Sequence, residues 1–204
     1  MPTANPCSDI SYETLPRRDV HRDRMSHRKW LDTVVASGII KTITGHGETN
    51  LLAIAGNTVV YHDLKYGIVR KLRPAINPKE VQTRLEGDAE IIQKALPAPI
   101  PVPVQTQIHY TSSELNFHIV QTQQAFIEGV DFMAPDFEPT DEMDPEKLEE
   151  DFIRISEASA KIFEEHGKYI DCAQSKNVLA TPEGLRLIDM ELPFDLMPVE
   201  PIAA

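Results

Sequence analysis

An α+β fold is predicted by the order in which strand-like and helix-like segments follow one another. Four short runs rich in β-branched residues come early, followed by an amphipathic helix, two further strands, a long helix and a hairpin. Turn residues separate the first four runs, which favours an antiparallel meander. At 204 residues the chain is long enough for one medium-sized domain, sheet-rich first and helical later.

The first half begins with a polar, aperiodic stretch, residues 1–23, which predicts a loosely ordered leader. Apolar residues at helical spacing predict a short helix over 24–36. A second helix is predicted over 78–96, where Pro78 stands near the start. The four strands of the meander are predicted at 39–44, 51–55, 59–62 and 67–72.

The second half opens with the proline-rich segment 97–104, which predicts an extended connector because proline interrupts helices. Asp144 is an expected N-cap with Pro145 at the first helical position, and Gly167 is expected to end this long helix. The strands of this half are predicted at 104–110, 115–129, 177–180 and 185–189.

Charge and cysteine content exclude several classes of protein. The 32 acidic and 20 basic residues give a formal net charge of −12, which argues against a nucleic-acid groove. Most of this charge lies in residues 128–165, with 14 acidic residues against three basic ones, a pattern typical of a solvated helix face. Two cysteines make neither a disulfide framework nor a zinc cluster, and no run is apolar enough to predict a membrane span.

A glycine-containing turn lies between the first two predicted strands. Over residues 44–50 it reads Thr-Gly-His-Gly-Glu-Thr-Asn, and Gly45 and Gly47 would let backbone amides approach a phosphate closely. The segment 53–59 is an alternative position for this turn, nearer in sequence to the lysine described next.

A lysine and a glutamate follow this turn. Lys71 lies on the predicted strand 67–72, and Glu90 follows about twenty residues later on the predicted helix. Glu86 lies one turn earlier, but a glutamate on an otherwise apolar face needs a cation, which favours Glu90 beside two isoleucines. Arg70 would take the place of Lys71 if the strand register shifted by one residue.

Acidic and amide side chains surround the last predicted hairpin. Asp171 and Asn177 precede it, and Asp189 ends its second strand. Phosphoryl transfer needs a carboxylate directed at the acceptor hydroxyl and hard oxygen ligands for Mg²⁺. These three residues are of the types that this chemistry requires.

Together these segments, within about 39–192, resemble a protein kinase with a sheet-rich N-lobe (about 24–128) and a truncated, mostly helical C-lobe (about 129–204). ATP and Mg²⁺ are the ligands that the resemblance implies. It further implies phosphate contacts for Gly45 and Gly47, ATP binding for Lys71 with Glu90 as its partner, Mg²⁺ binding for Asn177 and Asp189, and the catalytic base role for Asp171.

The chain departs from the kinase pattern around the expected base. Four residues separate Asp from Asn in the family, whereas five separate Asp171 from Asn177. Without a one-residue bulge, Cys172 would occupy the position of the base, so Asp171 and its neighbour are both candidates. The Asp-Phe-Gly element corresponds to Asp189-Met190-Glu191.

Only 15 residues follow Asp189, so the expected C-lobe lacks the helices that finish a usual kinase. In size and architecture the chain resembles the minimal type III effector kinases of the HopBF family. That resemblance implies a monomer secreted by a bacterium into a host cell, where it phosphorylates the host chaperone heat-shock protein ninety. No nucleic acid or membrane partner is expected.

Three functions are therefore open at this point. The first is an effector kinase acting on serine or threonine hydroxyls of a protein. The second is a small-molecule phosphotransferase of the aminoglycoside or choline-kinase type, favoured by the Gly-x-Thr-Asn form of the turn. The third is a non-catalytic pseudokinase that mimics a chaperone client, consistent with the displaced aspartate.

Overall fold

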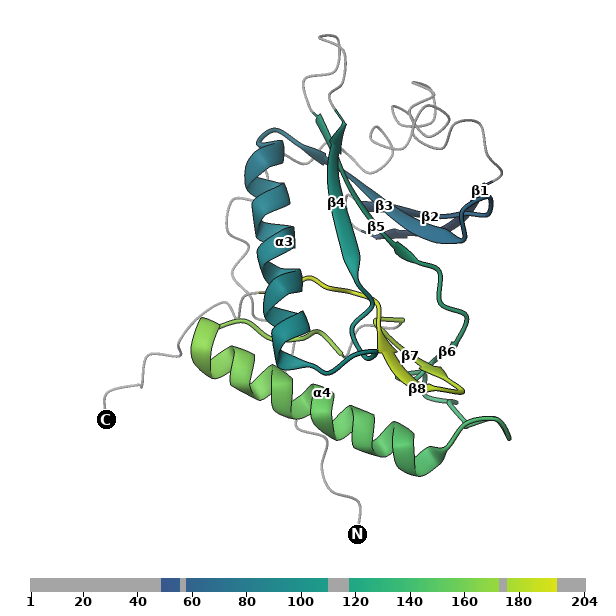
Figure 1. Cartoon of the computed structure of the whole chain (residues 1–204). Helices are drawn as coiled ribbons and strands as arrows, with labels where there is room; N and C mark the ends of the chain where they lie inside the picture. The colour runs from purple at the N-terminus through teal and green to yellow at the C-terminus, as the bar shows by residue number, and fades with distance from the viewer. Residues whose placement is uncertain (1–48, 56–57, 110–117, 173–175, 194–204) are drawn as a thin grey trace, which may run out of the picture.

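The computed structural model confirms the α+β class, with sheets and helices in both halves of the chain (Figure 1). Four predicted features lie outside the described residues: the leader 1–23, the helix 24–36, the strand 39–44, and the glycines Gly45 and Gly47. The structure describes residues 49–55, 58–109, 118–172 and 176–193.

The larger sheet has five strands in the order β1-β2-β3-β5-β4, and every neighbouring pair is antiparallel. The first three strands are the last three of the predicted four-stranded meander, and Gly67 makes the turn between β2 and β3 with a positive φ of 61°. The strands are β1 (Thr49–Ala55), β2 (Thr58–Asp63), β3 (Ile68–Ala75), β4 (Val104–His109) and β5 (His118–Ala125).

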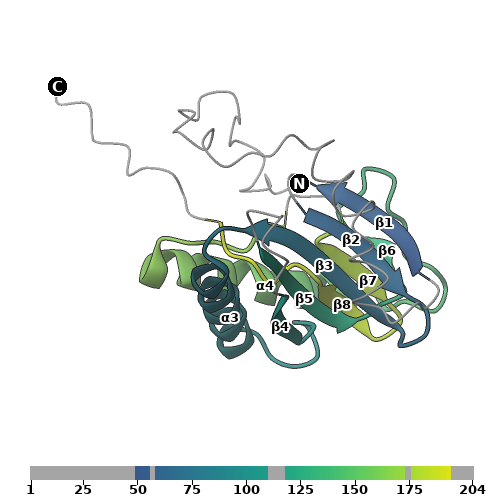
Figure 2. The same ribbon diagram turned by 90° about the horizontal axis from the view of Figure 1, so that it is seen from above.

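Helix α3 (Pro78–Ala95) lies beside β4 and β5, as Figures 1 and 2 show. Its buried Leu85 packs against Ala75 and Val120 of the sheet. Further along the helix, Ile92 is fully buried and belongs to a different core, shared with the second half of the chain. One helix thereby joins the two halves.

The second half contains helix α4 (Pro145–His166) and a three-stranded antiparallel sheet in the order β6-β7-β8. The two predicted ends of the helix are confirmed, because Asp144 accepts hydrogen bonds from Glu146 N and Lys147 N, and Gly167 adopts the left-handed conformation. The sequence predicts a mostly helical C-lobe. Its described part contains α4 and also three strands: β6 (Val130–Asp131), β7 (Val178–Thr181) and β8 (Gly184–Leu187).

The two sheets are joined by the segment between α3 and β4, which begins with a turn, Ile100 N donating to Pro97 O at 3.1 Å, and so is not extended throughout as predicted. Val102 N donates to Leu187 O at 3.0 Å, and Leu187 N donates to Ile100 O at 2.7 Å. Neither described helix is long and apolar enough to span a membrane. The main hydrophobic core lies between α3, α4 and the smaller sheet. Its fully buried side chains include Ile92, Leu148, Ile155, Ile162, Leu185 and Leu187.

Candidate functional site

The candidate site is an ion pair between β3 and the segment that follows β8. Lys71 Nζ donates to Asp189 Oδ1 at 3.1 Å and to the carbonyl oxygen of Ile188 at 3.2 Å. The Lys71 side chain is 15% exposed and that of Asp189 28% exposed, so both stay within reach of a ligand from solvent. Two predicted site residues, 118 positions apart in sequence, are thus in direct contact.

Strand geometry decides between Lys71 and Arg70. Successive side chains of a strand point to opposite faces. Arg70 points away from Asp189 and pairs with the buried Asp63 at 3.0 Å, while its NH1 donates to Gln123 Oε1 at 3.2 Å. The register therefore presents Lys71, and not Arg70, to Asp189.

A shallow, partly open hollow lies around the Lys71–Asp189 pair. Its wall combines apolar side chains with the amide of Gln124 and the hydroxyl of Thr122 from β5. The empty volume of the hollow, about 240 Å³ with open solvent included, is below the ~300–1,000 Å³ of usual ligand pockets. The remaining lining residues are Leu85, Val104, Met190 and Glu191.

Glu191 forms a second ion pair beside the first. Arg73 lies two residues after Lys71 on the same strand face and donates to both carboxylate oxygens of Glu191, with NH1 at 2.8 Å from Oε2. Arg84 NH1 of α3 lies 3.6 Å from Oε2. Burial alone would raise the pKa of Glu191, but hydrogen bonding to Arg73 and the charges of Arg73, Arg84 and Lys71 hold it below its ordinary value.

Asn177 is hydrogen-bonded to the backbone of Asp171 and to that of Ile188, the residue before Asp189. Its Nδ2 donates to the backbone oxygen of Asp171 at 2.8 Å, and its own backbone oxygen accepts from Ile188 N at 2.9 Å. The side-chain donor is thereby directed at the 171 backbone, and the amide oxygen Oδ1 is the group that could bind a cation. The half-buried Asp171 precedes the buried Cys172.

Glu90 does not take the position that the sequence suggested, and this expectation is corrected. Its side chain is 66% exposed and accepts a hydrogen bond from Lys94 Nζ at 2.6 Å, one turn along the helix. This hydrogen bond and the Lys94 charge lower the pKa of Glu90. The alternative, Glu86, is also exposed and accepts from Gln82. Lys71 therefore pairs with Asp189 rather than with a helix glutamate.

The buried carboxylate of α3 is Asp88, which the sequence reasoning missed. It is 1% exposed, and its oxygens accept from Lys168 Nζ at 2.6 Å and from Leu192 N at 3.3 Å. The signal was present in the sequence: Asp88 stands three residues after Leu85 and four before Ile92, inside the apolar stripe of the helix.

The residues of the site fit the ligands that the resemblance implied. Asp189 offers a carboxylate oxygen, Asn177 an amide oxygen and Lys71 a cation for phosphate. Among the described residues no group of three or more His, Cys, Asp or Glu could hold a metal ion. A magnesium ion at this site would be held by the side-chain oxygens of Asp189 and Asn177, which are ligands of the kind that Mg²⁺ prefers.

No model of a known protein family matches the chain, and no curated protein matches it in sequence.

Proposed function

We propose that this protein is an ATP-dependent kinase that transfers a phosphoryl group to a serine or threonine hydroxyl of another protein. The observation that carries the proposal is the contact of Lys71 on β3 with Asp189 after β8, with Asn177 hydrogen-bonded to the neighbouring backbone. A strand lysine, a metal-binding aspartate after a hairpin and a preceding asparagine form the set used by protein kinases.

Each residue has a distinct role in the proposed reaction. Lys71 neutralises charge on the phosphates of ATP, since its ammonium group lies in the lining of the hollow. Asp189 and Asn177 provide oxygen ligands for Mg²⁺, which when bound neutralises charge on the transferred group. Asp171 orients the acceptor hydroxyl from the loop that Asn177 holds through the 171 backbone oxygen.

The arrangement of elements adds support. The lysine strand lies at the centre of the five-stranded antiparallel sheet, and a helix follows it directly. The long helix α4 and the β7–β8 hairpin come later in the chain, and Asp189 after the hairpin contacts Lys71 of that strand while Asn177 accepts from Ile188 N. This order, a lysine strand followed by a helix and later by a long helix and a hairpin, supports the proposal.

The partner in this proposal is the host chaperone heat-shock protein ninety, and delivery is by bacterial secretion. Both rest on the resemblance to the HopBF effector kinases. The test therefore uses purified eukaryotic heat-shock protein ninety beside a whole eukaryotic lysate.

The purified protein is incubated with Mg²⁺ and ATP labelled at the γ-phosphate, in parallel with Asp189→Ala and the exposed-surface control Asp141→Asn. We expect label in a protein band, a loss of at least about 10²-fold in Asp189→Ala, and wild-type activity in the control. Label on an amine or sugar but on no protein would replace the proposal with a small-molecule phosphotransferase. No ATP turnover would contradict the proposed kinase, and a rise in melting temperature on adding ATP and Mg²⁺ would then indicate nucleotide binding without catalysis.

A further inference from the structure

We infer that Asp88 is the positioning residue of this site: one buried carboxylate on α3 that fixes both the loop carrying Asp171 and the segment carrying Asp189. The inference rests on the proposed function for its catalytic consequence. Asp88 touches neither substrate nor metal in this scheme, and it acts through the residues that it holds.

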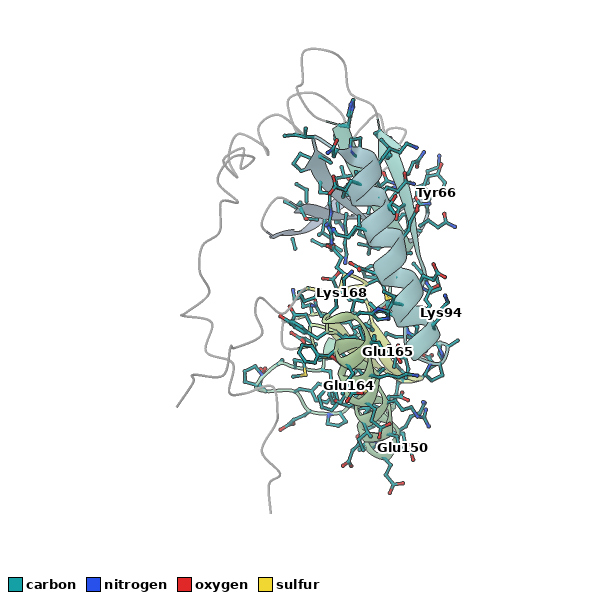
Figure 3. All side chains as sticks on the ribbon, turned by 90° about the vertical axis from the view of Figure 1, so that its left-hand side faces the viewer. Tyr66, Lys94, Glu150, Glu164, Glu165 and Lys168 are labelled. Atoms are coloured by element: carbon teal, nitrogen blue, oxygen red, sulfur yellow. The ribbon has the colours of Figure 1, made fainter. Side chains whose placement is uncertain are left out.

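The contacts of Asp88 reach two separate parts of the second half. Oδ1 accepts from Lys168 Nζ at 2.6 Å, which anchors the loop just after α4. Oδ2 accepts from Leu192 N at 3.3 Å, which anchors the segment after β8, and lies 3.5 Å from Arg84 NH1 on the same helix. Figure 3 shows Lys168 at the level where the part containing α3 meets the part containing α4.

The anchored points lie close to the predicted chemistry. Asp171 follows Lys168 by three residues, and Asp189 precedes Leu192 by three. Tyr169 N also donates to Pro193 O at 3.3 Å, so the loop and the segment are hydrogen-bonded to each other beside the carboxylate. Movement at Asp88 would therefore be transmitted to both aspartates.

The segment after β8 is held along its whole described length. Ile188 N donates to Asn177 O, Asp189 pairs with Lys71, and Glu191 pairs with Arg73. The Asp88 contact at Leu192 closes this series from the helix side. In protein kinases a glutamate of the helix that follows the lysine strand pairs with that lysine and so fixes the helix. Here Glu90 is exposed, and the ion pair of Asp88 with Lys168 fixes α3 instead.

The chain offers a matched control in Asp151 of α4. It is also 1% exposed, and like Asp88 it contacts two cationic side chains and one backbone amide, accepting from Lys147 Nζ at 3.1 Å, Arg154 NH1 at 3.3 Å and Leu185 N at 3.1 Å. Both carboxylates therefore face the same penalty when one partner of a buried pair is lost. Only Asp88 contacts the loop and the segment beside the site.

The experiment measures amide hydrogen exchange and phosphoryl-transfer kinetics of Asp88→Asn and Asp151→Asn in the full chain. We expect Asp88→Asn to speed exchange at least tenfold in peptides covering both 168–172 and 188–193, and Asp151→Asn to leave them at the wild-type rate. We further expect kcat to fall at least tenfold in Asp88→Asn, with a smaller fall in Asp151→Asn. Lys168→Arg, which keeps the cation, should retain more activity than Lys168→Gln.

Equal exchange in the two aspartate variants, or a change at only one of the two peptides, would overturn the inference. If Asp88→Asn does not fold, Lys168→Gln is measured in the same way, and unchanged exchange at 188–193 would overturn it equally. The exchange measurement needs no catalysis. A wild-type protein without ATP turnover would therefore refute the proposed function while the exchange result still decides whether Asp88 joins the two segments.

Discussion

Gly184 is restricted both by its backbone conformation and by the buried Asp151 carboxylate beside it. Its φ of 109° is one that other residues rarely adopt, and an added Cβ would collide with Asp151 Oδ2 and lie 2.9 Å from Lys147 Cε. We predict that Gly184→Ala destabilises the protein by about 1–3 kcal/mol from backbone strain, with more from displacement of the Asp151 contacts. Urea unfolding measures this loss.

Gly87 provides the comparison, because it lies within α3 and an added Cβ meets nothing within 4 Å. Gly87→Ala should therefore stabilise the protein by about 0.5–1 kcal/mol through helix propensity. Equal effects of the two substitutions would show that the space beside Gly184 is not restricted as described.

For single residues, the sequence predicts which residue types form the site better than it predicts which of them are in contact. Lys71 and Asp189 are both predicted site residues, and the structure places them in contact. The prediction of Glu90, with Glu86 as its alternative, is wrong because both glutamates lie off the apolar stripe of α3 and are exposed. The rotation of the helix against the sheet is fixed by packing of Leu85 and Ile92, and these two residues place Asp88 on the buried face.

At the scale of elements, the two helices differ in how they begin. Asp144 caps α4 through its side chain, whereas Asn77 at the start of α3 makes no side-chain hydrogen bond to the helix backbone. We predict that Asp144→Ala costs about 0.5–2 kcal/mol and that Asn77→Ala costs clearly less. Thermal unfolding of both variants tests this, and a larger loss in Asn77→Ala would contradict it.

The ends of α4 could be predicted because Asp, Pro and Gly impose local backbone preferences that do not depend on distant residues. The strand β6, Val130–Asp131, could not. It is only two residues long, and it exists because its backbone pairs with Ala180 and Leu179 of β7, some fifty residues away. Patterns of two residues carry no periodicity, so only the folded chain defines this strand.

At the scale of the whole molecule, ion pairs join the halves at the face where the site lies. Lys71 and Arg73 of β3 reach Asp189 and Glu191 after β8, while Asp88 of α3 reaches Lys168 after α4. These contacts span from 80 to 118 positions in sequence. Sequence spacing predicted the elements that carry these residues, but contacts of such separation depend on the packing of both sheets.

The ion pair of Glu191 with Arg73, which connects the segment after β8 to β3, should make the stability of the protein depend on pH. The folded protein holds the pKa of Glu191 below its ordinary value of 4.5, so the ionised form is favoured by folding. The resulting stabilisation is complete above about pH 5 and is lost as pH falls through the lowered value, where the folded protein also binds the proton. We therefore predict that the wild-type protein loses more stability than Glu191→Gln when the pH is lowered from about 6 to about 3.

Urea unfolding at pH steps across that range measures the difference, with the exposed α4 variant Glu149→Gln as the control that should follow wild-type. The gap between wild-type and Glu191→Gln should be widest near neutral pH, because Arg73 then faces an ionised carboxylate in one protein and an amide in the other. It should narrow on acidification, because protonation turns Glu191 into a neutral group as well. Parallel curves for the two proteins would mean that Glu191 does not join the halves through its charge.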